Sequence, residues 1–143
     1  MCSSDLCLVG HTTLRVATMD RLDRPAGASE TARMAQMTEE ALRAGAIGFS
    51  TGTYYPPATH ATTEEIIAAA MPLKAHGGRY VTHMRNEDDN IIAAMTEAFR
   101  IGREVGVPVI ISHHKVVGVR NYGRSEETLK LLEIGRASCR ERV

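Results

Sequence analysis

The chain has 143 residues, 43% of them hydrophobic and 24% charged, which is typical of one ordinary globular domain. Its 17 basic and 17 acidic residues give a formal net charge of zero, so we expect neither nucleic acid nor a membrane surface as a partner. No apolar run approaches the roughly 20 residues of a membrane span, and no secretory signal pattern opens the chain.

The first half of the chain predicts two helices separated by a short strand. Residues 29–45 place apolar side chains at helical spacing, with Ser29 able to cap the start and a glycine at the end. "AIGFSTG" (46–52) predicts the strand. The next helix follows the loop "PPATHATTEE", where Thr62 and Glu65 have the spacing of a capping box. It is expected to end at "HGG", after a kink or last turn at a proline.

The second half repeats the alternation. "RYVTH" (79–83) predicts a strand, "EDDNIIAAMTEAFRIGREVG" (87–106) a helix led by acidic residues, and "VPVIIS" (107–112) a buried strand before a last helix from Ser125. Repeated β–α units of about 30 residues predict a parallel sheet covered by helices. Doubly wound sheets and (β/α)8 barrels both have this pattern, but no glycine-rich phosphate motif follows a strand, which disfavours a nucleotide-binding sheet.

Two histidines occupy equivalent places in successive units. His83 closes one predicted strand and His113 the next, 30 residues later. In a parallel sheet both emerge at the carboxyl edge, where α/β folds place their chemistry. Two imidazoles there suit a zinc site, although each could simply cap its strand with a hydrogen bond. His114 points the other way on an extended backbone, and His11 is expected to be a structural cap.

Two cations and two phenols lie close to these histidines in sequence. Arg85 and Lys115 each follow one histidine by two residues, so on an extended backbone each shares its side. Cations beside a metal suit a substrate that bears a carboxylate, whereas the alternative is a solvated charge or an ion pair. Tyr54 and Tyr55 follow a strand, where a phenol can bind a ligand or pack against the next prolines.

The two ends of the chain resemble translated sequencing adapter. "EIGRASCRERV" (133–143) is the translation of a common short-read adapter, and "CSSDL" after Met1 is that of the opposite adapter end. We therefore exclude residues 1–6 and 133–143 and expect residues 7–132 to come from the middle of a longer protein. Cys7 is then the lone cysteine, so no disulfide framework is predicted and a cytoplasmic location is expected.

Four stretches together resemble one family in order and spacing: "GHTTLR", "GAIGFSTGTYYPP", "YVTHMRNE" and "VIISHHKVVGVRNYGRS". They are similar to the D-aminoacylase (N-acyl-D-amino-acid deacylase) family of the amidohydrolase superfamily, over nearly all of residues 8–132. The resemblance implies a metal-bearing (β/α)8 barrel, of which three to four β–α units are present here. It also implies hydrolysis of the amide bond of small N-acyl-D-amino acids to a carboxylate and a D-amino acid.

The resemblance also implies roles for particular residues. His83 and His113 match zinc ligands at the ends of barrel strands five and six, which act together with a cysteine upstream. Tyr55 and Lys115 match substrate-binding residues, and Arg85 lies in the motif as a further candidate. The HxH pair, the cysteine ligand and the catalytic aspartate of the family have no counterpart here, and the aspartate is expected downstream. The chain alone is therefore expected to be inactive.

Two other functions are compatible with the residues. One is another amidohydrolase, such as a hydantoinase-like cyclic amidase, which usually bridges two metals with a carbamylated lysine. The strand that discriminates it lies upstream of this sequence. The other is a non-catalytic α/β module whose histidines are structural.

Overall fold

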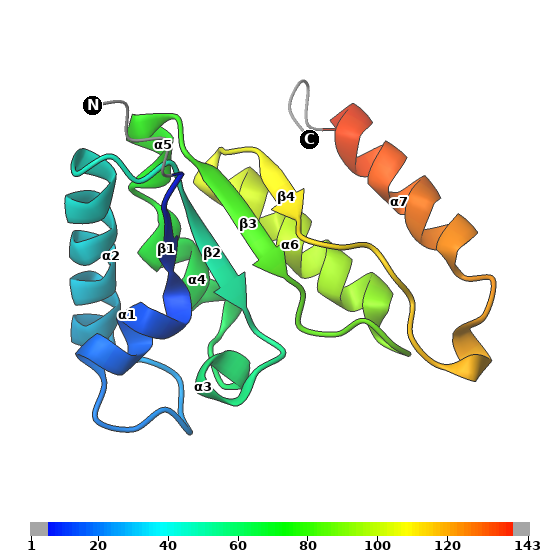
Figure 1. Cartoon of the computed structure of the whole chain (residues 1–143), viewed down its shortest axis with the longest axis horizontal. Coiled ribbons are helices and arrows are strands. Elements are labelled where there is room, and N and C mark those ends of the chain that lie inside the picture. The colour runs from blue at the N-terminus through cyan, green and yellow to red at the C-terminus, as the bar shows by residue number, and fades with distance from the viewer. Residues whose placement is uncertain (1–5, 139–143) are drawn as a thin grey trace.

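The computed structural model describes residues 6–138 as one parallel four-stranded sheet joined by helices (Figure 1). Each strand pairs with the next along the chain, in the order β1-β2-β3-β4. In the central pair, Phe49 lies opposite Tyr80 and Gly52 lies opposite His83. The predicted parallel sheet is therefore confirmed. Its strands are β1 (Leu8–Gly10), β2 (Gly48–Gly52), β3 (Arg79–His83) and β4 (Val109–Ile111).

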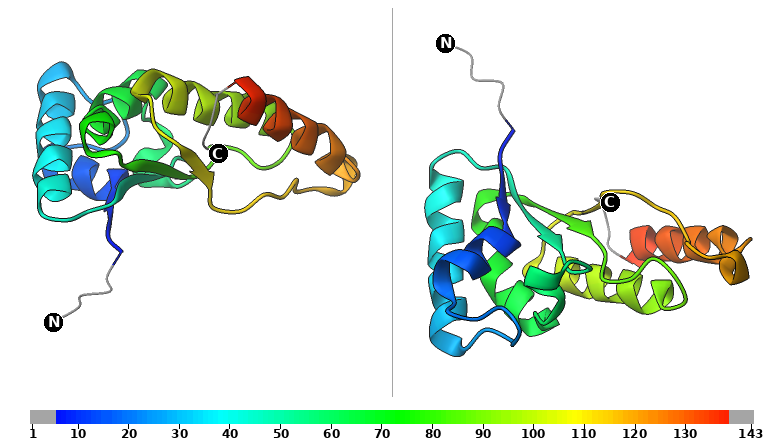
Figure 2. Two further views of the ribbon diagram at one scale, coloured as in Figure 1. Left: turned by 90° about the horizontal axis from the view of Figure 1, so that it is seen from above. Right: turned by 60° about the horizontal axis from the view of Figure 1, so that its bottom comes forward.

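Helices make every connection, and the main ones, α2, α4 and α6, lie on one face of the sheet (Figure 2). None of the helices in residues 6–138 is long and apolar enough to cross a membrane. The helices are α1 (His11–Thr18), α2 (Ala28–Arg43), α3 (Pro56–Thr59), α4 (Thr63–Ala70), α5 (Leu73–His76), α6 (Ile91–Val105) and α7 (Ser125–Ser138), with a 3₁₀ turn at Val119–Asn121.

The last helix extends into the stretch that resembles translated adapter. α7 continues from Ser125 to Ser138, past the predicted boundary at residue 132. The remaining adapter-like residues, 1–5 and 139–143, lie outside the described part of the chain.

Two of the predicted helix starts differ in detail from the structure. The cap of α2 is Gly27 rather than Ser29, because the Glu30 carboxylate accepts a hydrogen bond from the Gly27 N–H at 2.7 Å. At α4, the Thr62 hydroxyl accepts from the Glu65 N–H as predicted, at 3.1 Å. The Glu65 side chain does not complete the capping box, because it turns inward instead.

Glu65 turns inward to hold the first β–α unit against α4. Its carboxylate lies 2.5 Å from Nη1 of Arg15 and 3.0 Å from Nε2 of His11, and it accepts a hydrogen bond from the Ala26 N–H at 2.8 Å. All three side chains are buried. Burial disfavours the charged carboxylate, but the hydrogen bonds from His11, Ala26 and Arg15 outweigh it and lower the pKa of Glu65. His11 is therefore structural, as expected.

The acidic residues predicted to begin α6 form a loop before it. The Asn86 side-chain oxygen accepts hydrogen bonds from the N–H groups of Asp88 and Asn90, both at 3.0 Å, and α6 begins only at Ile91. Such Asx turns compete with helix formation, which explains the shift from residue 87. As a result, Glu87 lies on a loop at the carboxyl end of β3.

Only one face of the sheet is covered by the described helices. Phe49, Tyr80 and Val109 point to this face and join the buried core. Alternation along β4 sends Ile110 to the opposite face, where it is 44% exposed. The prediction that this strand is buried on both faces is therefore wrong for the described residues. His83 lies on the same open face as Ile110, two positions after Val81 on β3.

Candidate metal site

Two imidazoles meet where β3 and β4 end. His83 is the last residue of β3, and the Ser112 N–H donates to the Thr82 carbonyl at 2.9 Å, which continues the ladder to the residue before His113. Nδ1 of His83 lies 2.8 Å from Nε2 of His113, and the ring centroids are 4.6 Å apart. Their equivalent places in successive β–α units thus bring the two rings together, as the sequence predicted.

A carboxylate completes the group from the loop after β3. Oε1 of Glu87 lies 2.6 Å from Nδ1 of His113, the ring nitrogen that does not face His83. The other carboxylate oxygen contacts Nζ of Lys115, and the Glu87 side chain is only 9% exposed. Sequence reasoning missed Glu87 because it was placed in the first turn of a helix. Its position four residues after His83 was the available signal.

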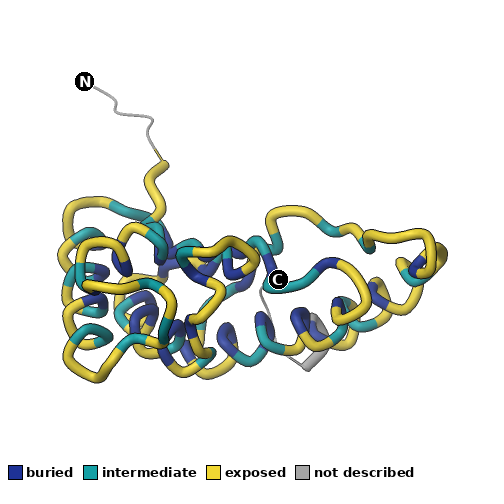
Figure 3. Tube along the Cα trace, turned by 90° about the horizontal axis from the view of Figure 1, so that it is seen from below, coloured by how far each residue is buried: buried dark blue, intermediate teal, exposed yellow. Residues whose placement is uncertain are grey.

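Lys115 and Tyr55 lie on the accessible side of this group. The segment after β4 that carries Lys115 is mostly exposed (Figure 3). Nζ of Lys115 lies 3.0 Å from Nδ1 of His113, and its side chain is 49% exposed. The rings of Tyr55 and Tyr54 lie 5.0 and 5.7 Å from that of His83, centroid to centroid. The structure therefore brings four of the five predicted site residues together with Glu87.

Arg85, the fifth, points elsewhere. Its Nε and Nη2 donate to the Glu97 carboxylate at 2.9 and 2.8 Å, and its guanidinium also donates to the carbonyls of Thr59 and Ala61, each at 2.9 Å. The hydrogen bonds to Glu97 raise the pKa of Arg85. Protein groups thus engage both terminal nitrogens and Nε, which favours a structural role for Arg85 over substrate binding.

The remaining histidine of the pair "HH" has a packing role. Nε2 of His114 lies 2.8 Å from the hydroxyl of Thr128, a buried residue of α7. His114 therefore faces away from His113, as alternation along an extended backbone requires.

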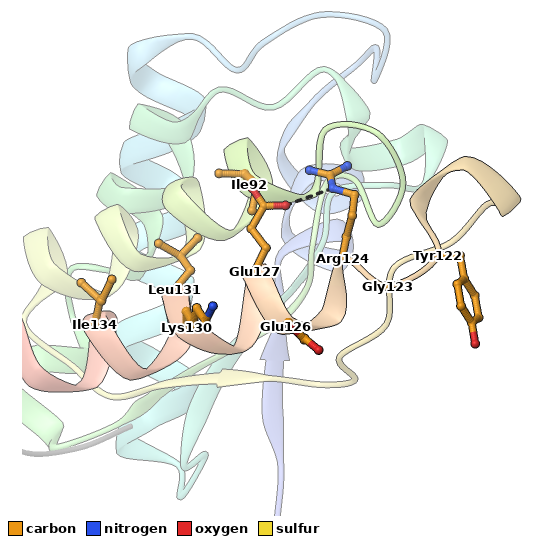
Figure 4. Close-up of a pocket in the computed structure, with 9 residues that line it drawn as sticks. All are labelled: Ile92, Tyr122, Gly123, Arg124, Glu126, Glu127, Lys130, Leu131 and Ile134. Atoms are coloured by element: carbon orange, nitrogen blue, oxygen red, sulfur yellow. Dashed lines mark hydrogen bonds and ion pairs between the residues drawn. The ribbon is translucent and has the colours of Figure 1, made fainter.

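A groove elsewhere on the molecule does not include the predicted site. It lies between α6 and α7, with a volume of about 660 Å³, and Ile92, Leu131 and Ile134 give it an apolar wall (Figure 4). Ile134, in one wall of this groove, comes from the stretch whose sequence resembles translated adapter.

The donor set fits a zinc ion. Ligand atoms of His83, Glu87 and His113 all lie within 4.8 Å of one another. Neutral imidazole nitrogen is a favoured zinc ligand. Burial lowers the pKa of His83 and so favours its neutral form. The charges of His113 and Lys115 lower this pKa further, whereas the Glu87 carboxylate raises it. Two nitrogens on a tetrahedral zinc lie about 3.3 Å apart. The facing nitrogens of His83 and His113, which lie 2.8 Å apart, therefore need to move apart only slightly to bind one zinc ion.

Known proteins share both the sequence and the fold of this chain, although no protein-family model matches it. The D-aminoacylase of Alcaligenes xylosoxydans xylosoxydans is 60% identical over 131 residues, which are 92% of this chain and 27% of that protein. The N-acyl-D-aspartate deacylase of the same organism is 54% identical over 137 residues, 95% of this chain and 27% of that protein. Nearly the whole chain is thus similar to one segment of these two deacylases.

Solved structures of D-aminoacylase-family proteins give the same result for the fold. A crystal structure of a D-aminoacylase matches with a TM-score of 0.91 at 57% identity, over 92% of this chain and 28% of that one. The N-acyl-D-glutamate deacylase of Bordetella bronchiseptica, solved with zinc and a phosphonate inhibitor, matches with a TM-score of 0.89 at 38% identity, over 93% and 28%. The four β–α units are therefore part of an amidohydrolase barrel, as expected.

The D-aminoacylase-family relatives are much longer than this chain. It spans about 27% of the length of the curated relatives it matches. A binuclear metal centre has been studied in one of the matching D-aminoacylases.

Proposed function

We propose that this chain is part of a zinc-dependent amidohydrolase that cleaves the amide bond of small N-acyl-D-amino acids to a carboxylate and a D-amino acid. The observation that carries the proposal is the meeting of His83 and His113 at 2.8 Å, with Lys115 at the rim. The deacylases named above support this function over a cyclic amidase. Within the same proposal, residues 7–132 are the family-derived part, and the cytoplasm is the expected compartment.

Each residue of the group has a distinct part in this function. His83 and His113 would hold the zinc through the nitrogens that face each other. When bound, zinc supplies polarisation of the amide carbonyl and activation of water. Lys115 offers an ammonium that is half exposed, suited to the substrate carboxylate. Tyr55, 51% exposed beside His83, offers a phenol to the same substrate.

The two histidines do not form a complete catalytic site by themselves. Catalytic zinc sites usually have three protein ligands, whereas the ligands proposed here are only the two imidazoles that face each other, with Glu87 assigned to position one of them. The 143-residue chain alone is therefore expected to release no D-amino acid, with or without added zinc. Zinc-dependent release of D-amino acid by the purified chain would contradict the proposal that these residues form only part of the catalytic site.

A chimera tests the function directly. Residues 8–132 replace the matching segment of the Alcaligenes D-aminoacylase, which is 60% identical. We expect the chimera to bind zinc and to hydrolyse N-acetyl-D-amino acids but not their L-enantiomers. A substrate panel with neutral and acidic side chains then defines its preference.

The control for the chimera is a variant that folds without the metal site. His113→Ala should retain the circular dichroism spectrum of the chimera while losing zinc and activity together. If the folded chimera carries no zinc, or if His113→Ala keeps full zinc content and activity, the proposed function is wrong.

A further inference from the structure

We propose that Glu87 is a positioning residue: it holds the ring of His113 in its metal-binding orientation and directs the ammonium of Lys115 toward the substrate. This inference rests on the proposed function. Glu87 is neither a predicted site residue nor part of the covered core, so its burial at the end of β3 calls for a physical reason.

The two nitrogens of His113 face different partners. Nε2 faces His83, whereas Nδ1 lies 2.6 Å from Oε1 of Glu87 and 3.0 Å from Nζ of Lys115. Of the two groups near Nδ1, only the carboxylate can accept a hydrogen bond from a ring N–H, because an ammonium has no acceptor. A histidine that binds a metal through one nitrogen usually donates its other ring N–H to a carboxylate or carbonyl, which fixes its tautomer and orientation. Glu87 contacts the nitrogen that such a partner would take. Oε1 is buried and has no well-aligned hydrogen bond, so a small rotation of the ring would satisfy both groups.

The second oxygen of Glu87 extends the same arrangement to Lys115. The carboxylate is 9% exposed, whereas the lysine side chain is 49% exposed. A carboxylate this well buried is stabilised only if cations pair with it. Lys115 has three donor hydrogens, and its Nζ contacts Glu87 and lies 3.0 Å from Nδ1 of His113, so at least one donor remains available to a substrate carboxylate. Glu87 thereby limits the directions that a flexible ammonium can take.

The backbone holds Glu87 in this position. The Val117 N–H donates to the Glu87 carbonyl at 2.6 Å, which ties the loop after β3 to the segment after β4. Met84, on the same loop, is buried, and Asn86 closes the turn that follows. The carboxylate is therefore carried by a fixed loop rather than by a mobile surface segment.

Three variants of the chimera test the role of Glu87. Glu87→Ala removes both contacts, so zinc affinity, measured by competition with a chelator, should fall by about 10- to 100-fold, and KM should rise. Glu87→Gln keeps an oxygen that can accept from Nδ1–H but loses the charge that holds the ammonium. It should keep zinc affinity closer to that of the parent while still raising KM.

Glu97→Gln is the matched control. Glu97 is a partly buried carboxylate of α6 that pairs with Arg85, away from the histidines. This variant should lower the melting temperature without changing zinc affinity or KM. If Glu87 had a purely structural role, Glu87→Ala and Glu97→Gln would both lower the melting temperature and leave zinc affinity and KM unchanged.

Three outcomes would overturn the proposal. The first is a zinc affinity of Glu87→Ala within twofold of the parent. The second is an equal loss in Glu87→Ala and Glu97→Gln. The third is a zinc-loaded crystal structure with a Glu87 oxygen about 2.0–2.2 Å from the metal, which would make Glu87 a ligand. If His113→Ala loses zinc while Glu87→Ala does not, only the role of Glu87 fails and the proposed function stands.

Discussion

Replacing Lys115 by methionine tests how this segment recognises the substrate. The lysine side chain is 49% exposed, and its ammonium contacts Glu87 and Nδ1 of His113. Lys115→Met keeps an unbranched side chain of similar length but removes the charge and all three donor hydrogens. Because the amine faces neither of the nitrogens proposed to bind zinc, the zinc content of the chimera should stay unchanged.

The size of the effect follows from the exposure of the ammonium. A hydrogen bond to a charged group contributes about 1.5–3 kcal/mol, and each 1.4 kcal/mol is about tenfold in rate. Half exposure and competition from Glu87 place Lys115 toward the lower end of that range. We therefore expect kcat/KM for an N-acetyl-D-amino acid to fall by about 10- to 100-fold, nearer tenfold.

The assay compares each N-acetyl-D-amino acid with its carboxamide, which lacks the carboxylate charge. The parent chimera should prefer the acid, and Lys115→Met should lose most of that preference while the carboxamide rate changes little. Loss of zinc in Lys115→Met, an unchanged kcat/KM for the acid, or an equal loss on acid and carboxamide would each refute the reasoning.

Three further predictions concern the metal and the fold of the chimera. His113→Ala removes one of the two neighbouring imidazoles, so its zinc affinity should fall by at least tenfold. Atomic absorption of the purified variant should then show less bound zinc than in the parent. Glu65→Gln should cost about 3–5 kcal/mol of folding free energy, because the buried Arg15 guanidinium keeps its hydrogen bonds to backbone carbonyls but loses its charged carboxylate partner. The pKa of Glu65 is lowered from 4.5 in the folded protein, so its contribution to the free energy of unfolding is fully present above that pH. The contribution is lost as the pH falls from 4.5 through the lowered pKa of the folded protein. The difference in melting temperature between Glu65→Gln and the parent should therefore shrink at acidic pH. An equal difference at pH 7 and pH 3 would contradict this. Gly102→Ala should destabilise, because the new Cβ would lie 2.1 Å from Cγ2 of Val109. Overpacking costs about 1–3 kcal/mol, and an approach this short places the cost toward the upper end of that range, above the gain of about 1 kcal/mol in helix propensity. A raised melting temperature would refute it.

The sequence alone determined the alternation of helices and strands from residue 29 onward and the pairing of the two histidines, but it did not predict β1 and α1. Periodicity and glycines mark the helices and strands, and equal positions in successive parallel units must meet at one sheet edge. For that reason His83 and His113 were predicted together and lie 2.8 Å apart. The resemblance to the D-aminoacylase family, and with it the expected barrel, also came from the sequence alone. Short motifs in a fixed order and spacing can be read from a sequence without its structure.

Only the tertiary structure decided which neighbouring side chains complete the group. Arg85 and Lys115 have the same offset from a histidine, yet Arg85 pairs with Glu97 on α6 while Lys115 stays at the rim. Glu87 reaches His113 because an Asx turn at Asn86 keeps it out of α6. The course of a loop depends on partners that are distant in sequence, and side-chain direction depends on which of them lie within hydrogen-bond reach, so spacing alone does not determine either.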